Sequence, residues 1–179
     1  MTRETAFNDV RGEDAAVEFV MDEETFRGFY ERNARGLWAY LARTTGDRAL
    51  ADDLLQETFY RFLRAGAAYE SEQHRRNSLY RIATNLVVDE RRRHAARAPS
   101  GEIEQAAPSS GAGAERSADL SRALAHLKPR ERAMLWLAYA EGATHREIAE
   151  ILGLETASLK PLLFRARRKL AALLGGGKA

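Results

Sequence analysis

The chain has 179 residues, of which 45% are hydrophobic, so it can form one ordinary domain or two small ones around a real core. It contains no cysteine, which excludes disulfides and thiolate metal sites and fits a reducing compartment. It shows no apolar leader and no run of about 18 uncharged apolar residues. We therefore expect a cytoplasmic protein without membrane insertion.

The formal net charge of +2 hides a strong separation of charge along the chain. Residues 1–24 carry eight acids and two bases, residues 75–97 seven arginines and two acids, and residues 160–169 five bases and no acid. Of the 28 basic residues, 24 are arginine, which suits contacts to phosphates and base edges. A GC-rich genome would also raise the arginine content, so the clustering is the more informative signal.

The first half of the chain predicts an acidic N-terminal arm, residues 1–22, followed by a small helical domain, residues 23–97. The composition of the arm fits an inhibitory tail and a solvated segment equally well. Helical apolar periodicity predicts helices over residues 24–43, 48–64 and 76–95. Asp47 is placed to cap the second of these helices, and a polar loop precedes the third.

Residues 98–118 are rich in Ala, Gly, Ser and Pro and have no apolar period, which predicts a flexible linker. Fully extended, this linker would span at most ~70 Å at about 3.3–3.6 Å per residue, which is about two turns of DNA. Two domains joined in this way could contact two sites on one face of a duplex.

The second domain is expected over residues 119–174, with residues 175–179 as a tail. A short apolar stripe over residues 120–127 precedes a helix that begins at Pro129 and continues to residue 141. The segment from Thr144 to Glu147 has the pattern of a capping box, and Gly153 is placed to end the short helix that follows. A last helix is predicted over residues 156–174. The fold class is thus all-α: two small helical domains joined by a flexible linker, the second containing a helix-turn-helix.

The last helix has an apolar side and a side that is rich in arginine. A helical projection places Ser158, Pro161, Phe164, Arg165 and Arg168 away from the leucines. Arginines on the outward face of a second helix are what reading the major groove requires. An ordinary helical hairpin with a solvated basic face is the alternative.

Two further helix faces suggest partners. Arg81, Asn85 and Arg92 lie opposite the apolar stripe of the 76–95 helix, where they could hydrogen-bond to phosphates or bases. The segment 51–59 is acidic, would repel DNA, and suggests a protein partner. For both faces, the alternative is that the charged side chains are simply solvated and bind no partner.

Signals for catalysis are missing from the sequence. There is no P-loop, Rossmann glycine pattern, HExxH motif or Cys/His metal spacing, and the four histidines are scattered. We expect no enzyme activity, no catalytic residue, no metal and no cofactor.

Four segments in this order resemble the extracytoplasmic-function sigma factors of bacterial RNA polymerase. They are Asp53-Leu54-Leu55-Gln56-Glu57-Thr58-Phe59, residues 79–89 (LYRIATNLVVD), residues 147–154 (EIAEILGL) and residues 165–170 (RARRKL). The resemblance covers about residues 24–95 and 119–174. It implies an alternative sigma factor that binds core polymerase and directs promoter recognition and transcription initiation.

The resemblance also implies roles for particular residues. Asp53, Gln56, Glu57 and Phe59 fall in the helix that docks on the clamp helices of the largest polymerase subunit. Residues that read and open the downstream promoter element would be Arg81, Asn85, Asp89 and Arg92. Residues that read the upstream element would be Ser158, Lys160, Arg165 and Arg168. Members of this family are often held inactive by an anti-sigma factor.

The sequence departs from the family pattern at three places. Ser78 stands where an aromatic residue, usually tryptophan, is common, and Tyr69 is the only aromatic in the preceding loop that could stack on an unpaired base. Pro161 and Leu162 replace the usual Ser-Arg of the recognition helix. An interior proline costs ~3 kcal/mol, and less if the helix begins at Ser158. Two alternatives therefore stay open: a sigma-like protein that sequesters an anti-sigma factor, and a helix-turn-helix regulator.

Overall fold

The computed structural model describes residues 21–97 and 114–175, and these form seven helices without a strand. They are α1 (Glu23–Thr45), α2 (Arg48–Arg64), α3 (Glu72–Arg97), α4 (Ala114–Ala125), α5 (Pro129–Tyr139), α6 (His145–Leu152) and α7 (Thr156–Gly175). The all-α fold class expected from the sequence is confirmed. The expected arm over residues 1–22 and most of the expected linker lie outside the described residues.

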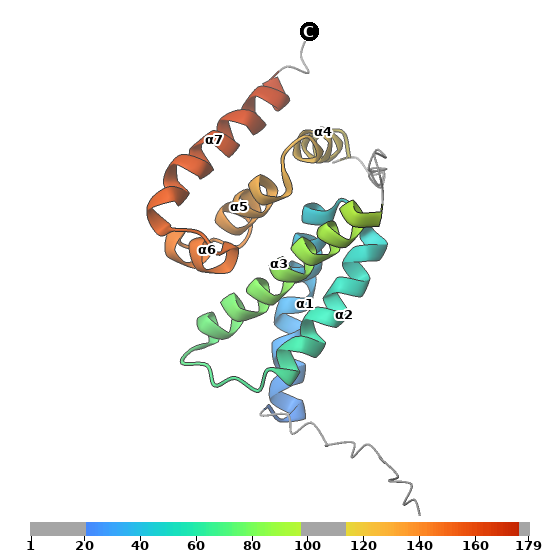
Figure 1. The fold of residues 1–179 in the computed structure, drawn as a ribbon, viewed down its shortest axis with the longest axis vertical. Coiled ribbons are helices and arrows are strands. Elements are labelled where there is room, and N and C mark those ends of the chain that lie inside the picture. Colours follow the sequence, from blue (N-terminus) through green and yellow to red (C-terminus); the bar gives the residue numbers. More distant parts are fainter. Residues whose placement is uncertain (1–20, 98–113, 176–179) are drawn as a thin grey trace, which may run out of the picture.

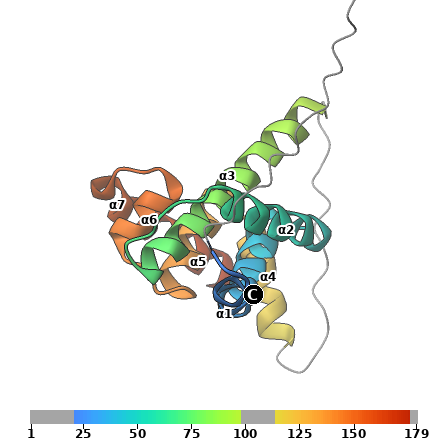
Figure 2. The ribbon, with the colours of Figure 1, turned by 90° about the horizontal axis from the view of Figure 1, so that it is seen from below.

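The helices gather into two groups (Figure 1). The first module consists of α1, α2 and α3, which pack on one another, and the second of α4 to α7, in which α7 contacts α4, α5 and α6. The view from below shows that α5 and α6 lie against the first module (Figure 2). The contacts between the modules run from α1 to α5 and from α3 to α6.

Local capping signals place several helix ends where the sequence predicts them. Asp47 caps α2 by accepting a hydrogen bond from the Leu50 backbone N–H at 3.0 Å. Thr144 and Glu147 form the expected capping box of α6. Gly153 ends α6 with a φ of 61°, in the left-handed region that glycine occupies without strain.

Two helices begin earlier than expected. Before α3, the side-chain hydroxyl of Ser71 accepts a hydrogen bond from the backbone N–H of His74, at 3.1 Å. The helix therefore begins at Glu72 and not at residue 76. Helix α4 begins at Ala114, so residues 114–118 do not belong to a linker. This segment holds Ala, Glu and Arg, and their helix propensity outweighs the composition on which the linker prediction was based.

One continuous hydrophobic cluster runs through both modules. Its largest fully buried side chains come from α1, α3, α5, α6 and α7: Phe29, Leu37, Tyr40, Leu41, Leu79, Leu86, Leu137, Ile148 and Leu159. The modules are therefore packed against each other through apolar side chains, which no pattern in the sequence predicts.

Candidate functional site

Helix α7 turns its apolar side inward and its basic side to solvent. Leu159, Leu163 and Ala166 are buried, in agreement with the helical projection. All four residues expected to contact upstream DNA on this helix are exposed: Ser158, Lys160, Arg165 and Arg168. The Arg168 guanidinium lies 5.9 Å from the centre of the exposed Phe164 ring, within the range of a cation–π contact.

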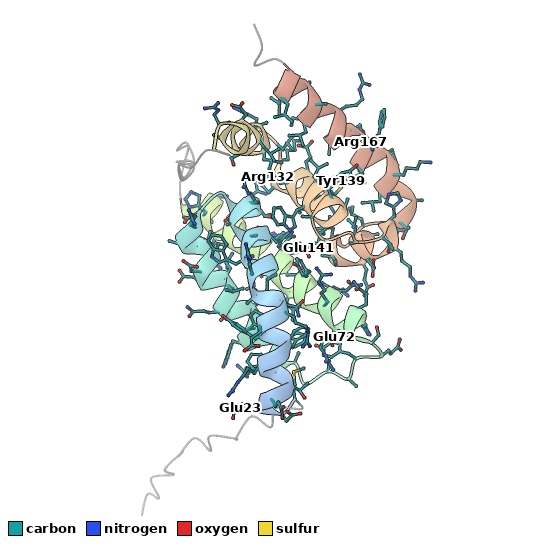
Figure 3. The ribbon with its side chains drawn as sticks, turned by 180° about the vertical axis from the view of Figure 1, so that it is seen from behind. Glu23, Glu72, Arg132, Tyr139, Glu141 and Arg167 are labelled. Carbon is teal, nitrogen blue, oxygen red and sulfur yellow. The ribbon has the colours of Figure 1, made fainter. Side chains whose placement is uncertain are left out.

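Two contacts tie α7 to the rest of its module. The Arg167 guanidinium donates to the Tyr139 hydroxyl at 3.2 Å, and Figure 3 shows these two side chains side by side. The Lys169 ammonium donates to the Glu131 carboxylate at 3.1 Å. Burial opposes ionisation of Glu131, but the hydrogen bonds from Lys128 and Lys169 outweigh it and lower its pKa. Arg167 and Lys169 thus hold the helix in place, which leaves Arg165 and Arg168 facing solvent.

A hollow lies on this basic side of α7. It is lined by His145 at the start of α6 and by Lys160, Pro161, Leu163, Phe164 and Arg167 of α7. No motif or helical projection of the sequence places His145 or Arg167 at this surface. The outward position of Phe164 was visible in the projection, whereas no local pattern brings His145 next to α7.

Pro161 lies inside α7. The helix begins at Thr156, so Pro161 is its sixth residue, and the alternative in which the helix begins at Ser158 is wrong. Proline has no backbone N–H, so the carbonyl of Ala157 lacks its helical donor. Ala157 and Pro161 are both exposed, so this missing helical donor lies on the solvent side of the first turns of α7.

Helix α3 has a comparable arrangement. Leu79, Ala83 and Leu86 are buried, whereas Arg81, Asn85 and Arg92 are exposed on the opposite side. Asp89 is half-buried, and its carboxylate lies 3.9 Å from the Arg92 guanidinium, so the two expected site residues form an ion pair with each other.

The loop before α3 differs from the expectation for Tyr69. Its ring stacks on Phe62 with the centroids 5.3 Å apart, and it meets His74 edge-on at 5.7 Å. Burial raises the pKa of the Tyr69 hydroxyl, while a hydrogen bond with Ser78 and the charge of Arg75 oppose this. One face of Tyr69 is therefore already covered. Stacking of an unpaired base on that face would require the ring to leave Phe62.

The acidic segment of α2 is partly surface and partly core. Asp53 and Gln56 are exposed, and the Glu57 carboxylate accepts a hydrogen bond from Arg61 at 2.6 Å. Phe59 is only 4% exposed and packs against the rings of Phe26, Phe29 and Tyr30. The side chain thus fills the core beneath the acidic surface, and its expected role in binding polymerase stays a prediction.

Neither a metal site nor a membrane span is found in the part of the chain that the structure describes. No group of three or more His, Asp or Glu side chains there could hold a metal ion. Residues 21–97 and 114–175 also contain no helix that is long and apolar enough to cross a membrane.

Two family models match the two modules. The model of sigma-70 region 2 matches residues 29–97, and the model of sigma-70 region 4 matches residues 117–170. The first match covers most of α1 and all of α2 and α3, and the second covers most of α4, all of α5 and α6, and most of α7.

Several known proteins are similar over most of the chain. The ECF RNA polymerase sigma factor SigL of Mycobacterium tuberculosis is 33% identical over 155 residues, which cover 83% of this chain and 88% of SigL. The ECF RNA polymerase sigma factor SigM of Bacillus subtilis is 29% identical over 161 residues, covering 86% of this chain and 97% of SigM.

Solved structures have the same fold. The sigma factor RpoE of Bartonella quintana, in complex with the anti-sigma factor NepR, superposes with a TM-score of 0.73 at 21% identity, over 84% of this chain and 96% of RpoE. CnrH, in complex with the cytosolic domain of CnrY, gives a TM-score of 0.65 at 25% identity, over 87% of this chain and 90% of CnrH.

Proposed function

Since the chain belongs to the extracytoplasmic-function sigma factors of bacterial RNA polymerase, we propose that it docks on core polymerase through α2 and reads promoter DNA through α3 and α7. The observation that carries this proposal is the geometry of α6 and α7. A capped short helix, a glycine turn and a second helix with outward arginines form a helix-turn-helix whose second helix turns its basic side to solvent.

The second module would contact the upstream promoter element. Arg165 and Arg168 can each donate two hydrogen bonds to one guanine in the major groove, and Lys160 and Ser158 can bind phosphates or base edges. Pro161 cannot donate to the Ala157 carbonyl, and its apolar ring stands on the exposed side of this helix. We therefore expect an upstream element different from that of relatives with Ser-Arg at this position.

The first module would contact the downstream element. Arg81, Asn85 and Arg92 present donors along one exposed face of α3, and Asp89 holds Arg92 by an ion pair. Because Ser78 replaces the common aromatic and Tyr69 is packed on Phe62, strand opening would depend on hydrogen bonding from α3 more than on stacking.

The acidic surface of α2 would bind the clamp helices of the largest polymerase subunit. Asp53 and Gln56 are its exposed members, and Glu57 lies beside them in an ion pair. Phe59 supports this surface from below. In this role the protein directs polymerase and catalyses no reaction itself. An anti-sigma factor is a further proposed partner, as in the complex of RpoE with NepR.

Purified core polymerase provides the test. The full chain should bind the core and start promoter-specific run-off transcripts on fragments of the native genome. Binding to neither polymerase nor promoter DNA would reject this function. Capture of an anti-sigma factor without transcription would instead indicate a protein that sequesters such factors.

A further inference from the structure

The junction between the two modules contains a buried ion pair. Glu141, in the turn after α5, pairs with Arg76 of α3, and the Glu141 side chain is only 9% exposed. The indole N–H of Trp136 donates to the same carboxylate at 2.9 Å. Figure 3 shows Glu141 between the second module and the helices of the first. A nearly buried carboxylate therefore depends on a cation from the other module.

Helix α1 is shaped to accept Glu141. A Cβ atom added at Gly36 would lie 3.4 Å from Glu141 Oε1 and 3.3 Å from the Tyr80 hydroxyl oxygen. The Tyr80 hydroxyl hydrogen-bonds to this carboxylate, and burial and the negative charge of Glu141 both raise the pKa of Tyr80. Glycine at position 36 thus leaves room for the Glu141 carboxylate against the first module.

A second polar contact lies nearby, between α6 and α3. Burial opposes ionisation of Glu147, but hydrogen bonds from Thr144 and from Asn77 and Gln73 of α3 outweigh it and lower its pKa. The side chains of Gln73 and Asn77 are themselves joined by a hydrogen bond of 2.9 Å. Polar groups of α3 thus meet the start of α6.

The junction also contains an unfavourable element. Arg132 of α5 is partly buried, and its Nε has no hydrogen-bond partner among the described residues. Burial and the nearby charge of Arg91 lower the pKa of Arg132, so two arginines from different modules repel each other here. An interface that combines ion pairs with unpaired like charges can separate more easily than a purely apolar one.

The closed arrangement covers part of the helix-turn-helix. A polar cavity between the modules is lined by Glu70, Ser71, Gln73, His74 and Asn77 on one side and by Thr144, Arg146, Glu147 and Glu150 on the other. In a helix-turn-helix the first helix crosses the DNA backbone. The start of α3 and the acidic Glu70 therefore lie where phosphates would have to approach α6.

We propose that the Arg76–Glu141 ion pair is a latch that holds the free chain closed and hides α6 from DNA. Opening separates the modules so that the helix-turn-helix can bind. The inhibitory part rests on the proposed function, whereas the closed state can be measured without DNA or polymerase.

Distance measurements on the full chain test the latch. The protein has no cysteine, so Ala49→Cys and Ala172→Cys, at exposed sites in α2 and α7, allow selective spin labelling. The otherwise unaltered labelled chain should show one distance population. Glu141→Gln keeps the side-chain size and should raise the ratio of open to closed molecules at least tenfold, and Arg76→Glu should raise it further.

Two controls keep the experiment decisive. Glu155→Gln removes an exposed carboxylate from the turn before α7 and should leave the distance unchanged. The exchanged pair Arg76→Glu with Glu141→Arg should restore the closed distance and normal helical circular dichroism. Any one of three results would overturn the latch. The chain could be open before any latch substitution, neither single variant could open it, or the exchanged pair could fail to restore the closed distance.

Binding to a promoter fragment tests the inhibitory role. Glu141→Gln should bind the upstream element at least fivefold more tightly than both the native chain and Glu155→Gln. An opened variant with unchanged DNA affinity would overturn the inhibitory role. If native and opened chains alike fail to bind DNA and polymerase, the proposed function itself is rejected. The spin-label distances test the latch independently of that result.

Discussion

The hydroxyl of Tyr40 in α1 donates a hydrogen bond to Thr84 Oγ1 in α3, with 2.8 Å between the oxygens. The direction follows from Thr84, whose single hydroxyl proton is given to the Tyr80 carbonyl. Burial raises the pKa of Tyr40 to about 12, so the hydroxyl stays protonated and serves as the donor. This bond joins the first and third helices of the first module inside its core.

The two partners of this bond should respond unequally to substitution. Tyr40→Phe removes the donor and should lower the free energy of unfolding by about 0.5–1.5 kcal/mol. Thr84→Val takes the Thr84 acceptor away from the buried Tyr40 hydroxyl and should cost about 1–3 kcal/mol. Urea unfolding of both variants measures the difference. An equal or reversed order would contradict the assigned direction.

Substitutions in α2 should separate surface from core. Asp53→Ala with Gln56→Ala should weaken binding to core polymerase by more than about 1 kcal/mol and leave the unfolding midpoint unchanged. Phe59→Ala should instead lower the free energy of unfolding by about 3–5 kcal/mol, because it empties a core position. Glu31→Ala, at an exposed position in α1, is the control for loss of a surface charge. Unchanged polymerase affinity in the double variant would remove the docking surface from α2.

The arginines of α7 should carry sequence discrimination. Arg165→Ala and Arg168→Ala should each weaken binding to the upstream element by ~1–3 kcal/mol if the side chain contacts guanine. Arg35→Ala removes an exposed arginine from the first module and should have little effect. Binding measured against salt concentration should show a slope of about −0.9 per phosphate neutralised. A flat salt response would argue against DNA binding by this face.

Stability in acid should depend on Glu147. Its pKa lies below the usual 4.5, so the folded state favours the carboxylate more than the unfolded state does. The resulting stability is fully present above pH 4.5 and is lost as the pH falls through the folded-state pKa below that value. Urea midpoints of Glu147→Gln should fall less steeply in this acid range than those of the native chain. Glu150→Gln, at an exposed position in the same helix, should keep the native slope.

Much of the local structure follows from the sequence. Asp47, Thr144 and Gly153 mark helix ends because a cap needs only a side chain or a backbone conformation within a few residues. The apolar periods of α3 and α7 predicted their exposed arginines correctly, because a helix fixes which residues share a face. The order of the four motifs also sufficed to identify the family.

Other features were decided by contacts between distant segments. Phe59 belongs to an acidic motif, yet it is buried because Phe26, Phe29 and Tyr30 of α1 surround it. Tyr69 lies in a polar loop, yet Phe62 covers one face of its ring. Arg76 and Glu141 are 65 positions apart, and no periodic pattern records that they meet. Periodicity reports which side of a helix is apolar, whereas the partner that covers that side depends on how whole helices pack.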